Sequence, residues 1–327
     1  MHKIPEGYTS SLTLKQTQVG IKRIKDYFED QVAMMLNCVR VSAPLFVSRQ
    51  SGLNDHLNNV EKPVTFEVFE GHMEIVQSLA KWKRHALKQY GFSIGQGLYT
   101  DMNAIRQSEE TSNIHSYFVD QWDWEKIIGA HLRNEVFLQE TVERIYEALL
   151  KTQEMVNEFF GFKENYLPSK IFFISSQELL DRYPQLSAKE REYAIAKEKG
   201  AVFISQIGLT LNNGTKHDNR AVDYDDWNLN GDIIVYYPIL DIALELSSMG
   251  IRVNREALLI QSQQKNIDSP YHRAILENTL PLSIGGGIGQ SRLCLFFLRK
   301  AHIGEVQASI WPSDFILECQ QRGIHLL

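Results

Sequence analysis

Two arginines and two carboxylates are placed where they could bind a phosphorylated ligand. Arg106 ends a short predicted strand, and Arg292 follows a run of glycines near the end of the chain. Asp232 and Glu245 lie on successive predicted strands. Arginine presents a planar fork of donors to phosphate, and paired carboxylates hold Mg²⁺ beside phosphate oxygens, so the set is typical of a nucleotide site. Taken singly, Asp232 and Glu245 fit equally well as exposed strand residues.

The glycine run at 283–292 reads SIGGGIGQSR and leads into an apolar stretch at 293–298. Glycine has no Cβ, so the run predicts a sharp bend or a close approach of the backbone to a ligand. A helix is expected to begin at its end, where free N–H groups and the side chain of Arg292 would favour an anion. A tight turn between a strand and a helix, with no ligand, explains the pattern equally well.

Helices and strands must position these residues. Apolar side chains recur every three or four residues over 13–35 and 135–160, which predicts two long amphipathic helices. Shorter helices are predicted at 80–90, 187–200 and 269–278. Strands are predicted at 39–47, 64–68, 102–106, 117–124, 171–174, 201–207, 232–236 and 242–247, and a loop at 48–59. The pattern favours a single α+β catalytic domain over 1–327, with a large, mainly antiparallel sheet flanked by helices.

Pro44 has no N–H to give to a neighbouring strand, so the segment 39–47 is predicted to be an edge strand. Together with the helix at 13–35, this strand is a plausible dimer surface. Trp122 and Trp124 alternate with Gln121 and Asp123 along one strand. The alternation favours core positions for both tryptophans over a stacking platform for a ligand.

Composition excludes several classes of protein. With 43% hydrophobic and 23% charged residues, the chain is an ordinary folded protein, and its net charge of -6 argues against a broad nucleic-acid surface. No apolar run is long enough to cross a membrane, and no apolar core of a signal peptide is visible, so a cytoplasmic location is expected. Cys38, Cys294 and Cys319 are too few and too scattered for a disulfide framework or a zinc site. Cys38 and Cys294 lie in apolar runs and are expected to be buried thiols.

Taken together, these segments resemble the signature motifs of class II aminoacyl-tRNA synthetases. The first helix and the strand around Pro44 resemble motif 1, the dimer element. Arg106 and the strand at 117–125 resemble motif 2, whose arginine holds the α-phosphate of ATP. Residues 285–292 resemble motif 3, whose arginine, here Arg292, lies on the γ-phosphate.

The resemblance narrows to one family, the ammonia-dependent asparagine synthetases, also called aspartate–ammonia ligases. It is carried, in family order, by residues 77–84, 97–100, 119–125, 175–180, 223–227, 229–232, 245–252 and the glycine run. The chain departs from the family in a longer N-terminus and in a shorter segment between Trp227 and Leu229.

The resemblance implies an AMP-forming carbon–nitrogen ligase of asparagine biosynthesis. L-aspartate and ATP would give β-aspartyl-adenylate and pyrophosphate, and ammonia would then displace AMP. The expected cofactor is Mg²⁺, with ATP as co-substrate. A homodimer is expected, without nucleic-acid or membrane partners.

The resemblance also implies which residues form the site. The catalytic residues would be Asp55, Arg106 and Arg292. The substrate-binding residues would be Ser78, Lys83, Gln121, Asp123, Asp225, Ser248 and Arg252. The ATP-binding residues would be Arg106, Arg220, Asp232, Glu245, Gly287, Gly289 and Arg292, with Asp232 and Glu245 as metal ligands.

Two roles follow from the family's substrate. Lys83 and Arg252 are hypothesised to grip the α-carboxylate of aspartate, so that the β-carboxylate faces Arg106. Asp55 matches the position that holds ammonium and takes its proton. A loop aspartate that caps a turn is an equally good interpretation of Asp55.

Three alternative functions would each require sequence features that differ from those of an ammonia-dependent ligase. A tRNA synthetase would usually add an anticodon-binding domain and a basic face, and neither is visible. A regulatory subunit that binds an amino acid without ligase activity would be expected to lose Arg106, Arg292, Asp232 or Glu245, and all four are present. A glutamine-dependent synthetase would need a cysteine nucleophile, typically N-terminal, and residue 2 is His2.

Overall fold

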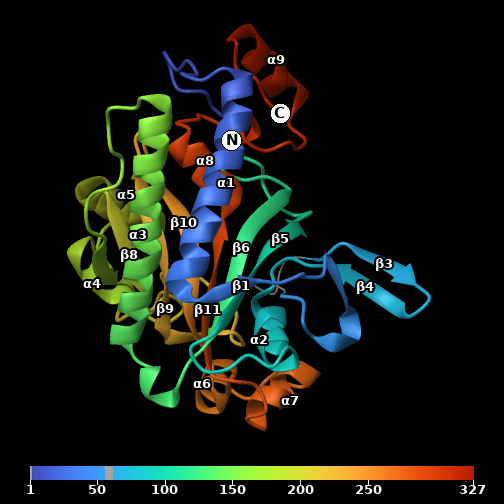
Figure 1. Cartoon of the computed structure of the whole chain (residues 1–327). Helices are drawn as coiled ribbons and strands as arrows, with labels where there is room; N and C mark the ends of the chain where they lie inside the picture. Colours follow the sequence, from blue (N-terminus) through green and yellow to red (C-terminus); the bar gives the residue numbers. More distant parts are fainter. Residues whose placement is uncertain (1, 56–61) are drawn as a thin grey trace.

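A sheet of eight strands forms the centre of the computed structural model, which describes residues 2–55 and 62–327 (Figure 1). In spatial order the strands are β1 (Cys38–Arg40), β5 (Gly97–Ile105), β6 (Phe118–Ile127), β11 (Ser283–Gly289), β10 (Ile242–Arg252), β9 (Asp225–Tyr237), β8 (Ala201–Ser205) and β7 (Phe172–Ser175). The inner pairs are antiparallel, and the outer pairs β1 with β5 and β7 with β8 are parallel. The predicted α+β class with a mainly antiparallel sheet is confirmed.

Two layers of helices cover the sheet. The long helices α1 (Leu14–Leu36) and α3 (Glu135–Phe160) pack together on one face, with α8 (Gln290–Phe297) beside α1 (Figure 1). This layer buries Trp122 and Trp124 in the main core, as their alternation predicted. On the opposite face, α2 (Ala80–Gln89) packs on β6 and β11, while α5 (Ala188–Lys199) packs on β8, β9 and β10.

The smaller elements lie around this frame. A second sheet has the order β2 (Phe46–Ser48), β4 (Gly71–Ile75), β3 (Thr65–Val68), and it projects to one side (Figure 1). The other helices are α4 (Ser176–Arg182), α6 (Arg255–Ser262), α7 (Pro270–Leu276), α9 (Ser313–Gln321) and the short 3₁₀ turns η1 (Arg49–Ser51), η2 (Ala130–Leu132) and η3 (Ile303–Glu305). None of the helices in the described part of the chain is both long and apolar enough to cross a membrane.

The first helix shows how local sequence sets the bounds. The Thr13 side chain accepts the N–H of Gln16, and the Gln16 side chain accepts the N–H of Thr13, so a capping box starts α1. Asn37 adopts a left-handed conformation and ends it. The buried face includes Ile24, Phe28, Val32 and Leu36, whose spacing of four residues places them on one side of a helix.

Three local predictions were wrong. The segment 39–47 is two strands, because the chain leaves the large sheet before Pro44 and enters the small one after it. Of the two interpretations of the glycine run, the sharp bend was wrong, because β11 pairs with β6 and β10 and has no positive φ. The strand before Arg106 begins at Gly97 rather than at Met102. Of the predicted loop at 48–59, residues 56–59 lie outside the described residues.

Candidate active site

The predicted site residues gather around one cavity of about 540 Å³ on the face of the sheet between α2 and α5. Those that line it are Asp55, Ser78, Lys83, Arg106, Gln121, Asp123, Arg220, Asp225, Glu245, Ser248, Arg252, Gly287, Gly289 and Arg292. Asp232 does not line the cavity, but it accepts a hydrogen bond from Arg220, which does. The sequence therefore brought together residues that lie as far apart in the chain as positions 55 and 292.

Strand alternation separates the cavity from the core. Gln121, Asp123 and Glu125 point to one face of β6, and Trp122 and Trp124 point to the other. Each of these three polar residues of β6 has a glycine of β11 directly beside it in the ladder. The sheet thus presents a row of polar side chains next to bare backbone.

The glycines of β11 form a flat floor. A Cβ placed on Gly287 would lie 2.5 Å from Gln121 Oε1 and 3.2 Å from Asp123 Oδ1. Gly286 faces the core instead, where a Cβ would lie 2.6 Å from the Cβ of Met249. Glycine is needed here for close approach, as predicted, but within a strand rather than at a turn.

Lys83 and Asp123 form a buried ion pair at this floor. Lys83 comes from α2, is 1% exposed, and donates to Asp123 Oδ1 at 2.5 Å and to the carbonyl of Gly286 at 2.7 Å. The second oxygen of Asp123 is buried and has no hydrogen-bond partner among the described residues. A buried polar atom without a partner is costly, so this oxygen is available for a ligand.

Arg252 is the centre of a second buried group. Its Nε and Nη2 donate to the carboxylate of Glu125 at 3.0 and 2.7 Å, and its Nη1 donates to Asp225. Ser283 also donates to Glu125 at 2.7 Å. Two carboxylates thus neutralise Arg252 and hold its pKa well above the ordinary value, although burial alone would lower it. Glu125, which the sequence reasoning did not single out, fixes this side of the cavity.

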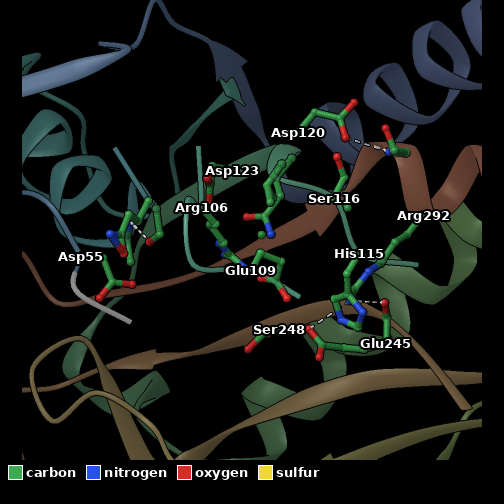
Figure 2. A pocket seen from close by; sticks show the side chains of 18 of the residues that line it. Asp55, Arg106, Glu109, His115, Ser116, Asp120, Asp123, Glu245, Ser248 and Arg292 are labelled. Carbon is green, nitrogen blue, oxygen red and sulfur yellow. Dashed lines mark hydrogen bonds and ion pairs between the residues drawn. The ribbon is translucent and has the colours of Figure 1, made fainter. Parts of the chain in front are cut away.

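Arg292 and Glu245 lie together at one end of the cavity (Figure 2). Arg292 is the third residue of α8 and donates to the backbone carbonyl of Glu245 at 3.0 Å, with 3.9 Å between the charged groups. Partial burial would raise the pKa of Glu245, but the charges of Arg292 and Arg220 lower it below its ordinary value. Glu245 therefore stays ionised beside the cationic groups.

A bulge in β10 turns Glu245 toward the cavity. Ser248 pairs with Asp232 and Glu245 pairs with Ile234, with a register shift between Glu245 and Ser247. The extra residue places Glu245 on the same face as Ser248 and Asp232, whereas regular alternation would put it on the opposite face. Burial raises the pKa of Asp232 to about 6, against the charge of Arg220, and its Oδ1 atom has no partner among the described residues.

Arg106 begins the loop between β5 and β6 that borders the cavity. It lies directly after β5, and its Nε is buried without a hydrogen-bond partner among the described residues. His115, in the same loop, lies close to Glu245 and Arg292 in Figure 2. Burial and the charge of Arg292 lower the pKa of His115 to about 4, so the ring is neutral. Sequence reasoning missed His115, although its place between the two motif 2 strands was a usable signal.

Asp120 anchors the start of α8. One oxygen accepts the N–H of Ser291 at 3.1 Å, and the other accepts the ammonium of Lys25 at 3.0 Å. This contact joins β6, α1 and the helix that carries Arg292. Asp120 was also missed, because its partners are remote in the sequence.

Asp55 lies at the other end of the cavity from Arg292, with Arg106 and Asp123 between them in Figure 2. It is 1% exposed. It is also near Lys81, since burial lowers the pKa of that lysine but the carboxylates of Asp223 and Asp55 raise it above its ordinary value. A buried aspartate beside a cavity is more than a surface turn cap, so the geometry favours the functional interpretation of this residue.

Within the described part of the chain, no three or more His, Cys, Asp or Glu side chains form a metal cluster. Cys38 and Cys294 are buried, as predicted, and Cys319 is buried as well; all three are free thiols. The predicted metal ligands Asp232 and Glu245 are only two carboxylates, and their role as ligands of Mg²⁺ stays a prediction.

Comparison with known proteins gives one consistent result. The family model described as AsnA, aspartate-ammonia ligase, matches residues 15–323. An aspartate–ammonia ligase of Clostridium perfringens is 56% identical, over 99% of this chain and 98% of that protein. One from Bacillus cereus is 54% identical, over 98% of this chain and 99% of that protein.

Solved structures give the fold. Asparaginyl-tRNA synthetase from Pyrococcus horikoshii, complexed with asparaginyl-adenylate, has a TM-score of 0.64 and 14% identity, over 90% of this chain and 70% of that one. Aspartyl-tRNA synthetase from Entamoeba histolytica has a TM-score of 0.61 and 13% identity, over 90% and 59%. These identities support the fold alone, and the predicted class II synthetase-like fold is confirmed.

Proposed function

The chain belongs to the aspartate–ammonia ligase family, and on this premise we propose how its cavity makes asparagine from aspartate and ammonia. It is a ligase that forms a carbon–nitrogen bond. Its relatives are named for this activity, and the similarity covers nearly the whole length of both chains. That activity replaces the alternative of a regulatory subunit without ligase activity.

The reaction has two steps. First, an oxygen of the aspartate β-carboxylate attacks the α-phosphorus of ATP, the bond from that phosphorus to the β-phosphate oxygen breaks, and pyrophosphate leaves with the electron pair. Second, ammonia attacks the activated β-carbonyl carbon, and the bond from that carbon to the AMP oxygen breaks. The nitrogen, which enters as ammonium, loses two protons in all. The asparaginyl-adenylate bound by the Pyrococcus horikoshii synthetase supports an aminoacyl-adenylate on this fold.

ATP occupies the end of the cavity that contains the arginines. Arg106 lies on the α-phosphate, where the buried Nε without a partner supports its role as a donor. Arg292 lies on the γ-phosphate, and Arg220 contributes further positive charge. Gly287 and Gly289 let the nucleotide lie close to the strand. Because these cations are already fixed, they stabilise the charge that develops as pyrophosphate departs.

Asp232 and Glu245 would hold Mg²⁺. The unpartnered Oδ1 of Asp232 and the ionised neighbour Glu245 fit a cation that prefers oxygen ligands. When bound, the metal neutralises phosphate charge. The bulge in β10 puts Glu245 on the same face of the sheet as Asp232 of β9.

Aspartate occupies the middle of the cavity. Lys83 is the first contact of the α-carboxylate, and the free oxygen of Asp123 suits the α-ammonium. The other predicted contacts are Ser78, Gln121, Asp225 and Ser248. Arg252 already faces two carboxylates, so its share in binding the α-carboxylate stays a prediction.

Ammonium enters at the end that contains Asp55. The carboxylate of Asp55 accepts a proton from ammonium and leaves ammonia with a free electron pair for attack. The separation of Asp55 from Arg292 and Glu245 in Figure 2 supports this division, because the base then lies away from the departing pyrophosphate.

Several features of the whole protein belong to the same proposal. The chain acts as one catalytic domain over residues 1–327, and α1 with β1 supplies a homodimer surface. A cytoplasmic location and a lack of nucleic-acid partners stay predictions.

One observation carries the proposal: unpartnered buried atoms of both Arg106 and Asp123 belong to residues that line the same cavity. The test is purified protein with ATP, Mg²⁺, aspartate and ammonium, followed for AMP, pyrophosphate and asparagine. Equal amounts of the three products are expected. ADP in place of AMP would exclude an adenylate.

A further inference from the structure

Gln77 is a buried polar residue whose side chain has no partner in the protein. It lies between β4 and α2, is 0% exposed, and lines the cavity. Among the described residues, neither its amide oxygen nor its amide nitrogen makes a hydrogen bond. A carboxamide can accept through the first atom and donate through the second, so both functions remain for a ligand.

The backbone around Gln77 is held firmly. Its N–H donates to Asn54 Oδ1 at 3.0 Å, and Asn54 Nδ2 donates to Glu74 Oε2 at 3.0 Å. Asn54 and Glu74 are each 3% exposed. This network ties Gln77 directly to the residue that precedes Asp55, so the carboxamide and the carboxylate belong to the same end of the cavity.

A purely structural role does not explain this side chain. A buried glutamine that stabilises a fold hydrogen-bonds within the protein, as the amide oxygen of Gln153 does by accepting the N–H groups of Tyr166 and Leu167 at 2.8 Å. An apolar residue of similar length would fill the space at Gln77 without burying two unsatisfied groups. The arrangement becomes favourable only when a polar ligand occupies the cavity.

We propose that Gln77 binds the nitrogen substrate beside Asp55. Its Oε1 accepts one N–H of the incoming ammonium, and its Nε2 donates to an oxygen of the β-carboxyl group that the nitrogen attacks. This inference rests on the proposed function, and it assigns to Gln77 a role that neither the sequence reasoning nor the comparisons gave.

The chemistry of an amide suits this role. An amide oxygen is too weak a base to take the proton, so Gln77 holds the nitrogen while Asp55 accepts the proton. Ammonium has only donors, and an acceptor pair formed by Oε1 and Asp55 therefore favours ammonium over other cations that cannot donate. Because Gln77 contacts both the nitrogen and an oxygen of the β-carboxyl group, the nitrogen is oriented toward the carbonyl carbon.

The test separates nitrogen binding from adenylate formation. In Gln77→Met, which keeps the length but removes both polar atoms, the KM for ammonium is expected to rise about tenfold or more. Aspartate-dependent exchange of pyrophosphate into ATP, measured without ammonium, is expected to stay within about twofold of the unmodified protein. Ser247→Ala is the matched control, because Ser247 Oγ is also buried without a partner but does not line the cavity.

A second variant tests the same role if the Gln77→Met protein does not fold. Gln77→Ala shortens the side chain, so the ratio of methylamine to ammonium use, as kcat/KM, is expected to rise about tenfold. An unchanged ammonium KM in a folded Gln77→Met protein, or a parallel loss of exchange, would overturn the role of Gln77. If the unmodified protein itself formed no AMP and asparagine, the proposed function would fail instead.

Discussion

Lys83 is buried in the fold and is also the proposed contact of the substrate. Its ammonium is buried against Asp123 and the Gly286 carbonyl, and Asp123 keeps one oxygen without a partner. A buried charge needs compensation, and here the compensation is incomplete on the acidic side. An amino acid, which carries both a carboxylate and an ammonium, can complete it.

Substitution of Lys83 tests this assignment. In Lys83→Ala the KM for aspartate is expected to rise about tenfold or more, because a charge-assisted contact is lost, while the KM for ATP stays within about twofold. Steady-state kinetics check both values. Lys88→Ala, at an exposed position of the same helix, is the control. An unchanged aspartate KM in folded Lys83→Ala would remove Lys83 from the aspartate site.

Asp55 is expected to act only after the adenylate has formed. Asp55→Asn keeps the shape but cannot accept a proton, so asparagine formation should fall by about a hundredfold or more. Exchange of pyrophosphate into ATP without ammonium should persist. Full ligase activity in this variant would show that another group deprotonates ammonium.

His302 makes stability depend on pH. Its Nδ1 accepts the N–H of Gly304 at 3.0 Å, its Nε2 lies 2.9 Å from Nδ1 of His2, and burial lowers its pKa to about 3. The unfolded chain binds a proton near pH 6.5, but the folded chain does not, so stability is full above that pH and falls in acid.

The expected size of this effect is measurable. From about pH 7 to about pH 5, His302 alone should lower the free energy of unfolding by about 2 kcal/mol. Denaturant titrations at both pH values check this in the unmodified protein and in His302→Gln, which should show a smaller decrease. Equal decreases in the two proteins would rule out His302 as the source.

At the scale of elements, β11 has one face in the core and the other at the cavity. Gly286 faces the core and Gly287 faces the cavity, so the same substitution should have different effects at adjacent positions. In Gly286→Ala, the new Cβ would lie 2.6 Å from the Cβ of Met249 and 2.7 Å from the carbonyl oxygen of Ser248, which cannot move away easily. In Gly287→Ala it would meet the movable end of Gln121.

These contacts give a paired prediction. Gly286→Ala should reduce the free energy of unfolding by about 1–3 kcal/mol, as overpacked core positions do. Gly287→Ala should change it by less than about 1 kcal/mol but raise the KM for aspartate or ATP several-fold, by about the loss of one contact. Thermal unfolding and kinetics on both variants check this. A core-like loss of stability in Gly287→Ala would contradict the cavity floor.

The loop between β5 and β6 is held from outside the sheet. Asn113 Nδ2 donates to the carbonyls of Lys3 and Ala301 at 2.6 and 2.7 Å, and its Oδ1 accepts the N–H of Lys3 at 2.8 Å. These hydrogen bonds attach the N-terminal segment to the loop that carries His115, which forms part of the cavity wall.

The sequence anticipated elements with continuous patterns and residues within recognisable motifs. The helix at Glu135–Phe160 matched its apolar period, and Arg106 and Arg292 reached the same cavity. It did not reveal that Gln77 would be unsatisfied, because that depends on what surrounds the side chain. Nor did it reveal the bulge at Glu245, since the register of β10 is set by β9.

At the scale of the whole molecule, the proposed mechanism places three binding regions along one cavity. In this proposal, phosphate charge is held where Arg292 and Glu245 lie, aspartate at Lys83 and Asp123, and the nitrogen at Asp55 and Gln77. These residues come from β6, β10, α2, α8, the segment after η1 and the segment between β4 and α2, so the site exists only when the sheet and both helical layers are assembled. A modest destabilisation of the sheet should therefore impair every step together.

The most direct test of the central claim follows one oxygen atom. Aspartate labelled with ¹⁸O in its β-carboxylate is incubated with the protein, ATP, Mg²⁺ and ammonium, and the products are analysed by mass spectrometry. A β-aspartyl-adenylate predicts one labelled oxygen in each AMP and none in pyrophosphate, because the bridging oxygen stays with phosphorus when nitrogen displaces AMP. Label in pyrophosphate or inorganic phosphate, or unlabelled AMP formed together with asparagine, would contradict the account.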